Sequence, residues 1–222
     1  MTTYHQLEFL HPDPQFFYLE GEGSDGSTTI LDSSCYNRSC VAAGNAQIRT
    51  GVSGALGSGV IDLDASAGTW VTIPEPPWLA ITNGYDFAIQ VRVKFKTAAG
   101  TFQTLLALRQ TSNAWTLYRE SGGEIALFNS NPTIVITGTT VLSLSGPWYE
   151  IWWMRIDGVH RLYVDGVAEG ATYNQTGTIG GVGDTAGAIQ DVRIGGNFAG
   201  NNRANVYIER IRMLSGRAIP LT

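Results

Sequence analysis

The sequence is short of the features that mark several classes of protein. Charged residues make up only 15% of the 222 residues, the 14 Lys and Arg form no basic run, and the net charge is −5. A surface that binds nucleic acid needs a clustered basic patch to neutralise phosphates, so no nucleic-acid partner is expected. No stretch of about 18 apolar residues is present, so no membrane insertion is expected.

Cysteine and histidine are also scarce. Cys35 and Cys40 lie in one polar loop, and the chain has three histidines, of which His160 is expected on the surface of a hairpin. A structural zinc site takes four Cys or His ligands, and this set offers no such constellation. Two reduced thiols are the favoured interpretation, and a short-loop disulfide is the alternative outside a cell.

Alternation of apolar and polar side chains is what the sequence offers most clearly. Residues 86–96 alternate with period two, which predicts an antiparallel strand with one buried face and one wet, basic face. Residues 148–156 are apolar on both faces, which predicts a central strand covered on both sides, with Trp148, Trp152 and Trp153 in the core. Further short strands are expected at 59–64, 69–73, 102–109, 114–119, 124–128, 133–137, 159–165, 189–195 and 206–214.

Turn residues and one change of phase complete the pattern. Gly122-Gly123 and Asp157-Gly158 predict tight hairpins. The alternation changes phase within 206–214, which predicts a β-bulge near Glu209-Arg210. Apart from a single turn at 77–81, no segment shows a helical period, so a sandwich or barrel is expected. We expect an N-terminal arm or first strand at 1–15 and one domain at 16–222.

Several segments match a known family in the right order. They are LDSS at 31–34 with Asn37, DFAI at 86–89, the Trp-led strand at 148–151, RIDG at 155–158, RLYVDG at 161–166, DVRIGG at 191–196 and YIERIR at 207–212. Together they resemble the laminin-G-like, concanavalin A-like jelly-roll family over 16–216. The resemblance implies an all-β, two-sheet antiparallel jelly-roll sandwich. The family includes glycan binders, adhesion modules, enzyme appendages and bacteriophage tail or capsid proteins.

Two departures from the family pattern bear on calcium. Glu209 stands where the family has an Asp in its closing strand, and Cys35 stands where the family loop has a Gly. The oxygen ligands on offer are Asp32, Asn37, Asp62, Asp64 and Glu209, and their spacing fixes no subset. We expect no cofactor, keep calcium as the alternative, and leave the metal ligands unassigned.

The candidate chemistry favours binding over catalysis. Asp62 and Asp64 share one strand face and come nearest to the paired carboxyl groups that retaining glycosidases place about 5–5.5 Å apart, but solvation or local hydrogen bonding is the favoured interpretation. No Gly-x-Ser-x-Gly elbow is present. We therefore expect no enzyme and no catalytic residues. Because aromatic faces stack on sugar rings, the glycan-contact candidates are Trp78, Trp115 and Tyr173, which are placed in loops or near strand ends.

The function implied by this resemblance is that of a non-catalytic structural or attachment protein of a bacteriophage virion. A capsid decoration protein and a tail or fibre component fit equally, with other virion proteins as partners in a symmetric assembly and host-surface glycans as further ligands. Without a secretory signal in the first residues, synthesis in the host cytoplasm and location in the virion are expected. The alternatives are a free carbohydrate-binding, lectin-like protein and, less favoured, a glycoside hydrolase or polysaccharide lyase.

Overall fold

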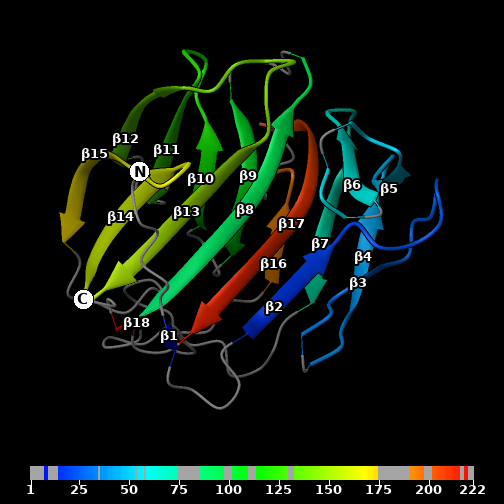
Figure 1. Ribbon diagram of the computed structural model, residues 1–222, viewed down its shortest axis with the longest axis horizontal. Helices are drawn as coiled ribbons and strands as arrows, with labels where there is room; N and C mark the ends of the chain where they lie inside the picture. Colours follow the sequence, from blue (N-terminus) through cyan, green and yellow to red (C-terminus); the bar gives the residue numbers. More distant parts are fainter. Residues whose placement is uncertain are drawn as a thin grey trace.

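The protein is an all-β sandwich in a computed structural model that describes residues 8–9, 15–34, 36–53, 55–57, 59–74, 86–97, 102–109, 114–129, 133–174, 191–197, 202–215 and 218–219. Two eight-stranded antiparallel sheets lie one behind the other (Figure 1). Within these ranges no helix has the length and hydropathy that a membrane crossing requires.

The sheet in front in Figure 1, called here the front sheet, holds the longest strand and positions the candidate site. Its spatial order is β15 (Val167–Asn174), β14 (Val159–Val164), β13 (Tyr149–Ile156), β8 (Phe87–Phe95), β17 (Asn205–Ser215), β6 (Gly59–Asp64) and β5 (Gln47–Thr50), and β2 (Gln15–Glu20) also pairs with β17.

The second sheet, called here the back sheet, covers the inner face of the first. Its order is β12 (Thr133–Val141), β11 (Glu124–Asn129), β10 (Ala114–Arg119), β9 (Gln103–Arg109), β16 (Asp191–Ile194), β7 (Trp70–Pro74), β4 (Ser39–Ala43) and β3 (Ile30–Leu31). A separate pair joins β1 (Glu8–Phe9) to β18 (Ala218–Ile219).

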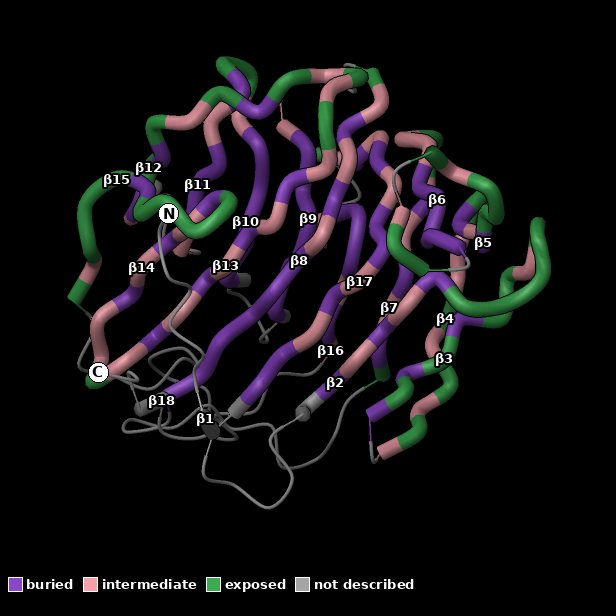
Figure 2. The backbone as a smooth tube through the Cα atoms, in the orientation of Figure 1, coloured by how far each residue is buried: buried purple, intermediate pink, exposed green. Residues whose placement is uncertain are grey.

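The core is the layer between the sheets, and period-two alternation builds it. In β13 the side chains alternate strictly between buried and half-buried positions, and in β8 the odd-numbered side chains from Phe87 to Phe95 are all buried. Figure 2 shows the same alternation along the front strands. Because successive side chains point to opposite faces of a strand, one face of the front sheet faces the core and the other faces outward.

Two tight hairpins and one bulge fix the register. Asp157 and Gly158 both have positive φ (50° and 75°), as do Asp165 and Gly166 (48° and 80°). This is the backbone of the type I′ turn, which matches the twist of paired strands. In β17 the register with β8 shifts between Ile208 and Arg210, which confirms the bulge predicted from the phase change.

The sandwich is closed along one edge by a buried carboxylate. Glu169 on β15 is 2% exposed and accepts hydrogen bonds from the backbone nitrogens of Thr139 (2.6 Å) and Thr140 (2.9 Å) on β12. At Gly170 a Cβ atom would lie 2.1 Å from the carbonyl oxygen of Thr137, so only glycine permits this close approach of the two edge strands. The edge of the front sheet is therefore tied to the edge of the back sheet.

Candidate functional site

The candidate site is the outward-facing side of the front sheet, called here the outer face. Backbone pairing aligns five of its side chains across five neighbouring strands, and we call this set the aromatic row: Tyr163, Trp152, Gln90, Arg212 and Tyr18, on β14, β13, β8, β17 and β2. All but Gln90 are half-buried, so their side chains lie at the surface of the sheet without extending freely into water. The outer face turns toward the viewer in Figures 1 and 2.

Hydrogen bonds and ring contacts hold the centre of the aromatic row in place. The indole Nε1 of Trp152 donates to Glu150 Oε1 (2.8 Å), and Arg212 Nε donates to Gln90 Oε1 (2.6 Å). The Arg212 guanidinium carbon lies 5.9 Å from the centre of the Trp152 ring, within the range of a cation–π contact. Gln90 is 2% exposed beneath these neighbours. The result is a fixed aromatic surface with polar groups between the rings.

A row of charges runs beside the aromatic row, two residues further along each strand. Glu150, Arg92, Arg210 and Glu20 are aligned across β13, β8, β17 and β2. Arg210 pairs with Glu150 (3.8 Å), and Arg92 pairs closely with Glu209, the bulged residue of β17. Arg92 also lies over the ring of Trp148, 5.5 Å from its centre. The arginines here are therefore held by carboxylates and by an aromatic ring.

Positive charge gathers on this one face of an acidic chain. Half of the 14 Lys and Arg lie on or beside the outer face, although the whole chain carries a net charge of −5. These residues are Arg49, Arg92, Lys94, Lys96, Arg161, Arg210 and Arg212. The predicted basic face of residues 86–96 is thus part of a larger surface rich in Lys and Arg, on which four of the seven (Arg49, Arg92, Lys96 and Arg210) pair with carboxylates.

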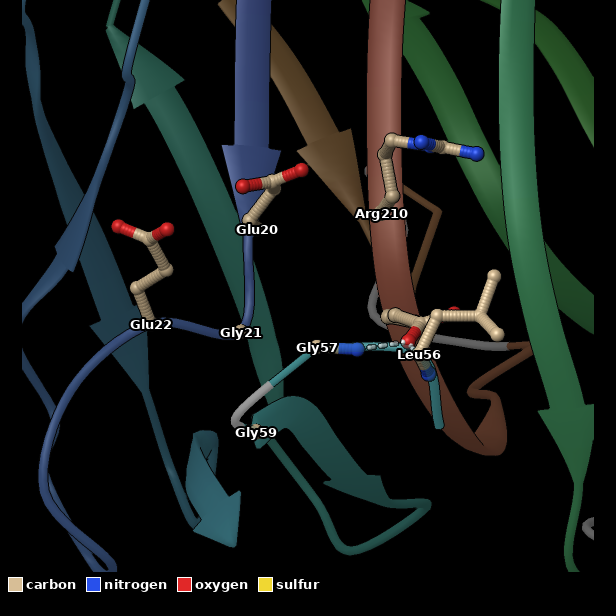
Figure 3. Close-up of a pocket in the computed structure, with 8 residues that line it drawn as sticks. Glu20, Gly21, Glu22, Leu56, Gly57, Gly59 and Arg210 are labelled. Carbon is tan, nitrogen blue, oxygen red and sulfur yellow. Dashed lines mark hydrogen bonds between the residues drawn. The ribbon is translucent and has the colours of Figure 1, made fainter. Parts of the chain in front are cut away.

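A shallow depression opens at the end of β2 (Figure 3). Its volume is about 200 Å³, and Glu20, Glu22, Glu209 and Arg210 line it together with Leu56 and neighbouring glycines. Burial raises the pKa of the Glu20 carboxyl group, the nearby Glu22 raises it further, and Arg210 opposes both. Ligand pockets in proteins usually measure 300–1,000 Å³ or so. The depression is too small for an oligosaccharide, which favours the open outer face as the candidate site.

The bulge in β17 directs Glu209 toward a loop. Its carboxylate accepts hydrogen bonds from the backbone nitrogens of Leu56 and Gly57 (2.7 Å to the second), a bond drawn in Figure 3. The indole Nε1 of Trp148 binds the same loop through the carbonyl oxygen of Ser53 (3.1 Å). Glu209 is therefore a structural anchor for this loop, and its carboxylate already binds the loop and Arg92.

The predicted glycan contacts fall in three different places. Trp115 is 3% exposed in the core and stacks on His160, with ring centres 4.7 Å apart and planes 9° apart, so its expected contact with a sugar is wrong. Tyr173 is half-buried on β15 and packs against this core, 6.3 Å from the Trp115 ring. Trp78 lies outside the described residues. The alternation of β10 places Trp115 and Leu117 inward, a signal that the sequence already contained.

The expected surface position of His160 is also wrong. Its side chain is 0% exposed, and its Nδ1 accepts a hydrogen bond from the indole Nε1 of Trp153 (3.0 Å). An imidazole nitrogen accepts only when it carries no proton, so this bond requires the neutral tautomer whose proton is on Nε2. His160 is thus a core residue that stacks on Trp115 and is hydrogen-bonded to Trp153.

Asp62 and Asp64 lie on one face of β6, as expected, and other groups of the chain already engage both. Asp62 is 8% exposed and pairs with Lys96 and with Arg49 (3.3 Å). Burial raises the pKa of Asp64, but hydrogen bonds from Asn45, Ser66 and Thr69 outweigh it and lower the pKa to about 2. A carboxyl group with so low a pKa is a poor proton donor near neutral pH. The geometry favours the predicted structural role of this pair.

The oxygen ligands considered for calcium are spread over the fold. Asp32 is 0% exposed, accepts hydrogen bonds from the backbone nitrogens of Tyr18 (2.8 Å) and Ser34 (3.0 Å), and pairs with Arg38 (3.5 Å). Asn37 lies in the following turn, with φ of 44°. Within the described ranges, no three Asp, Glu, His or Cys side chains come together as a metal site. Calcium binding stays an untested alternative.

Cys40 lies on β4, half-buried, as a free thiol. Burial raises its pKa to about 12, because the thiolate is disfavoured away from water and close to Asp32. The thiolate is the reactive form of cysteine, so this thiol is chemically inert near neutral pH. Cys35 lies outside the described residues.

The comparisons with known proteins agree with this architecture. A family model described as the concanavalin A-like lectin/glucanases superfamily matches residues 64–219. The chain belongs to this superfamily. The match confirms the laminin-G-like jelly-roll resemblance, and the two antiparallel sheets confirm the predicted fold class. A search of curated protein sequences finds no match.

Solved structures with a similar fold include a toxin binding domain, a domain of an arabinanase and a sialidase. Domain 4 of AbnA, an extracellular arabinanase of Geobacillus stearothermophilus solved with arabinotriose, is 15% identical, with a TM-score of 0.66 and coverage of 95% of this chain and 96% of that domain. The binding domain of botulinum neurotoxin serotype G is 14% identical, with a TM-score of 0.66 and coverage of 92% and 48%. Trypanosoma rangeli sialidase in complex with sialic acid is 14% identical, with a TM-score of 0.63 and coverage of 91% and 31%.

These likenesses reach only as far as the fold. The chain spans about half of the toxin binding domain and about a third of the sialidase, whereas it matches almost the whole of the arabinanase domain. At identities of 14–15%, the similarity concerns the arrangement of strands and not the residues of a site. The site must therefore be argued from this chain's own side chains.

Proposed function

We propose that the protein is a non-catalytic carbohydrate-binding sandwich whose aromatic row is the platform for an oligosaccharide. The observation that carries the proposal is the alignment of half-buried Tyr163, Trp152 and Tyr18 on neighbouring strands, with Gln90 and Arg212 between them. Aromatic faces are apolar platforms for the C–H faces of sugar rings, while side-chain donors and acceptors bind sugar hydroxyls.

The dimensions of the row suit an extended ligand. Neighbouring strands lie about 4.8 Å apart, so the four steps from Tyr163 to Tyr18 span about 19 Å, the length of a short oligosaccharide. Membership of the concanavalin A-like lectin/glucanases superfamily, and a similar domain solved with arabinotriose, support the same class of ligand. On an open face we expect each sugar ring to add only a modest affinity, so that several rings together are needed for measurable binding.

A glycan array followed by calorimetry tests the proposal. The matched control is Trp70, which lies on the outer side of the back sheet and is likewise half-buried beneath an arginine, Arg193, at 4.3 Å. We expect Trp152→Ala to weaken binding of the best glycan at least about tenfold, or 1.4 kcal/mol, and Trp70→Ala to leave it unchanged. Binding to no glycan, or equal effects of both variants, contradicts the proposal. A parallel array with a chelator tests the calcium alternative.

The absence of catalysis is a separate part of the proposal. It is supported by the engagement of Asp62 with Lys96 and Arg49 and by the low pKa of Asp64, which makes Asp64 a poor proton donor near neutral pH. We expect no turnover of any glycan that binds. If turnover is detected and is lost in both Asp62→Asn and Asp64→Asn, the protein is a hydrolase or lyase.

The setting that we propose for this binding is a bacteriophage virion, in the capsid or the tail. This setting is supported by the resemblance of the chain to a family that includes phage structural proteins, and the outer face would then serve attachment to host-surface glycans. Quantitative mass spectrometry of purified virions tests it. We expect the protein at a fixed copy number per particle, and its absence from infectious particles would leave the free lectin-like protein as the function.

A further inference from the structure

One arginine of the outer face differs from its cationic neighbours. Arg92 pairs with Glu209, Arg210 with Glu150, and Lys96 with Asp62, so each of these charges meets a carboxylate of the same chain. Like Lys94 and Arg161, Arg212 has no carboxylate within ion-pair distance among the described residues, but of these three it is the one that belongs to the aromatic row, where it lies half-buried between Gln90 and Tyr18.

The Arg212 side chain is nevertheless held in a defined orientation. Its Nε donates to Gln90 Oε1 (2.6 Å), and its guanidinium carbon lies over the ring of Trp152, 5.9 Å from the ring centre. Gln90 is itself 2% exposed and cannot easily move away. Because Nε is already bonded to Gln90, the two terminal guanidinium nitrogens of Arg212 are the donors that remain for a ligand on the aromatic row. A guanidinium held in this way is preorganised for the two parallel hydrogen bonds that a carboxylate accepts.

The surroundings of Arg212 also favour an external anion. Burial lowers the pKa of its guanidinium, and the nearby Arg210 lowers it further, against weaker opposing effects of Glu150 and Glu20. A charge that is partly removed from water and lacks a counter-ion gains more from a bound anion than an exposed charge does. Lys94 and Arg161 provide further positive charge on the same face.

We infer that Arg212 binds the carboxylate of an acidic sugar whose ring stacks on the aromatic row, so that the preferred ligands are glycans bearing carboxylate groups. This inference rests on the proposed function and adds to it the class of sugar. Trp152 supplies the stacking surface, common to neutral and acidic sugars, and Arg212 supplies the selectivity. Removing each residue should therefore have a different effect.

Calorimetry with matched pairs of ligands tests the inference. The pairs are oligogalacturonate with its fully methyl-esterified form and sialyllactose with lactose, and a sulfated neutral oligosaccharide distinguishes carboxylate recognition from general attraction of anions. We expect the wild-type protein to prefer at least one acidic member at least tenfold and to bind the sulfated sugar more weakly. Adding salt should reduce this preference, because exposed charges are screened.

Substitutions separate the contribution of Arg212 from that of the overall charge of the outer face. We expect Arg212→Gln to abolish the preference, so that the acidic and neutral members of each pair bind with similar affinity, and Arg212→Lys to keep only part of the preference, because lysine lacks the planar fork. Lys94→Gln, which removes the same charge from the same face, should retain the preference. Thermal unfolding of each variant verifies that it folds.

The outcomes are distinguishable. Binding of neutral and acidic members with equal affinity, or a preference that survives in Arg212→Gln, overturns the inference and leaves the proposed function standing. Equal loss in Arg212→Gln and Lys94→Gln assigns the preference to the overall charge of the face and overturns the role of Arg212. Absence of binding to every saccharide overturns the proposed function and the inference together.

Discussion

Trp152 and Trp153 are neighbours in the sequence, yet they lie on opposite faces of β13 and have opposite environments. Trp153 is 0% exposed, and its indole donates to buried His160 between further aromatic rings. Trp152 is half-buried, and its indole donates to Glu150 at the surface. The same side chain thus stabilises the fold at one position and forms a candidate binding surface at the next, so the two faces can be perturbed separately.

The largest expected effect is on stability and belongs to the inner face. Trp153→Ala should lower the free energy of unfolding by about 3–5 kcal/mol, because it leaves a cavity among packed rings. Trp152→Ala should lower it by about 1 kcal/mol, because Trp152 buries less apolar surface in the folded protein than Trp153 does. Urea unfolding of both variants measures the difference. Similar losses in the two variants would show that the faces are not distinct.

The next effect concerns the edge where the two sheets meet. Glu169→Ala should cost about 1.5–3 kcal/mol, the range for hydrogen bonds to a charged group. Burial raises the pKa of Glu169, but hydrogen bonds from Thr140 and Thr139 outweigh it and lower the pKa below its ordinary value of 4.5. The stabilisation is therefore complete above pH 4.5 and is lost as the pH falls through the folded-state pKa.

Unfolding experiments at a series of pH values test this link between the sheets. Between neutral pH and pH 3, the wild-type protein should lose more stability than Glu169→Ala, since the variant has no carboxylate to protonate. Parallel losses in the two proteins would show that the charge of Glu169 does not stabilise the edge.

A third substitution sharpens the account of the inner face. His160→Phe keeps a ring stacked on Trp115 but removes the acceptor of the Trp153 indole, which leaves a buried N–H without its bond. We expect a loss of about 1–3 kcal/mol and no change in glycan affinity. Calorimetric unfolding together with a binding titration measures both. A change in affinity of tenfold or more would mean that the inner face also controls the site.

The smallest expected effect lies at the end of β6. Asp64→Asn should cost about 1 kcal/mol, because it weakens hydrogen bonds in a turn that is partly exposed. The pKa of about 2 places the loss of this contribution in wild type between pH 4 and pH 2, as the carboxylate is protonated. Nuclear magnetic resonance titration of the carboxyl carbon measures the pKa directly. A value near the ordinary 3.8 would contradict the hydrogen-bonded geometry.

Much of the fold followed from local pattern. Period-two alternation located β8, short β-rich runs located β6 and β10, and a run apolar on both faces located β13. The Asp157-Gly158 turn joined β13 to β14, and the phase change in β17 located the bulge. β15 was not predicted, although Asp165-Gly166 is the same kind of turn and marks its start. Turn chemistry alone at Asp165-Gly166 predicts a further hairpin, so the sequence does contain the signal for β15.

The candidate site was much harder to predict. Residues 148–156 are apolar on both faces, which suggested cover on both sides, but the structure leaves Trp152 half-exposed beside Arg212. The aromatic row depends on β13, β8, β17 and β2 being neighbours, although β2 and β17 come from opposite ends of the sequence. Alternation within one strand gives the face of each residue, but strand order decides which residues meet across the sheet.

The most direct test of the account follows the indole N–H signals of Trp152 and Trp153 by nuclear magnetic resonance during titration with the glycan that binds best. Each signal is assigned by its loss in the corresponding Trp→Phe variant. We predict that the Trp152 signal shifts in proportion to the bound fraction while the Trp153 signal stays in place. A shift of neither signal at saturation would contradict binding at the outer face.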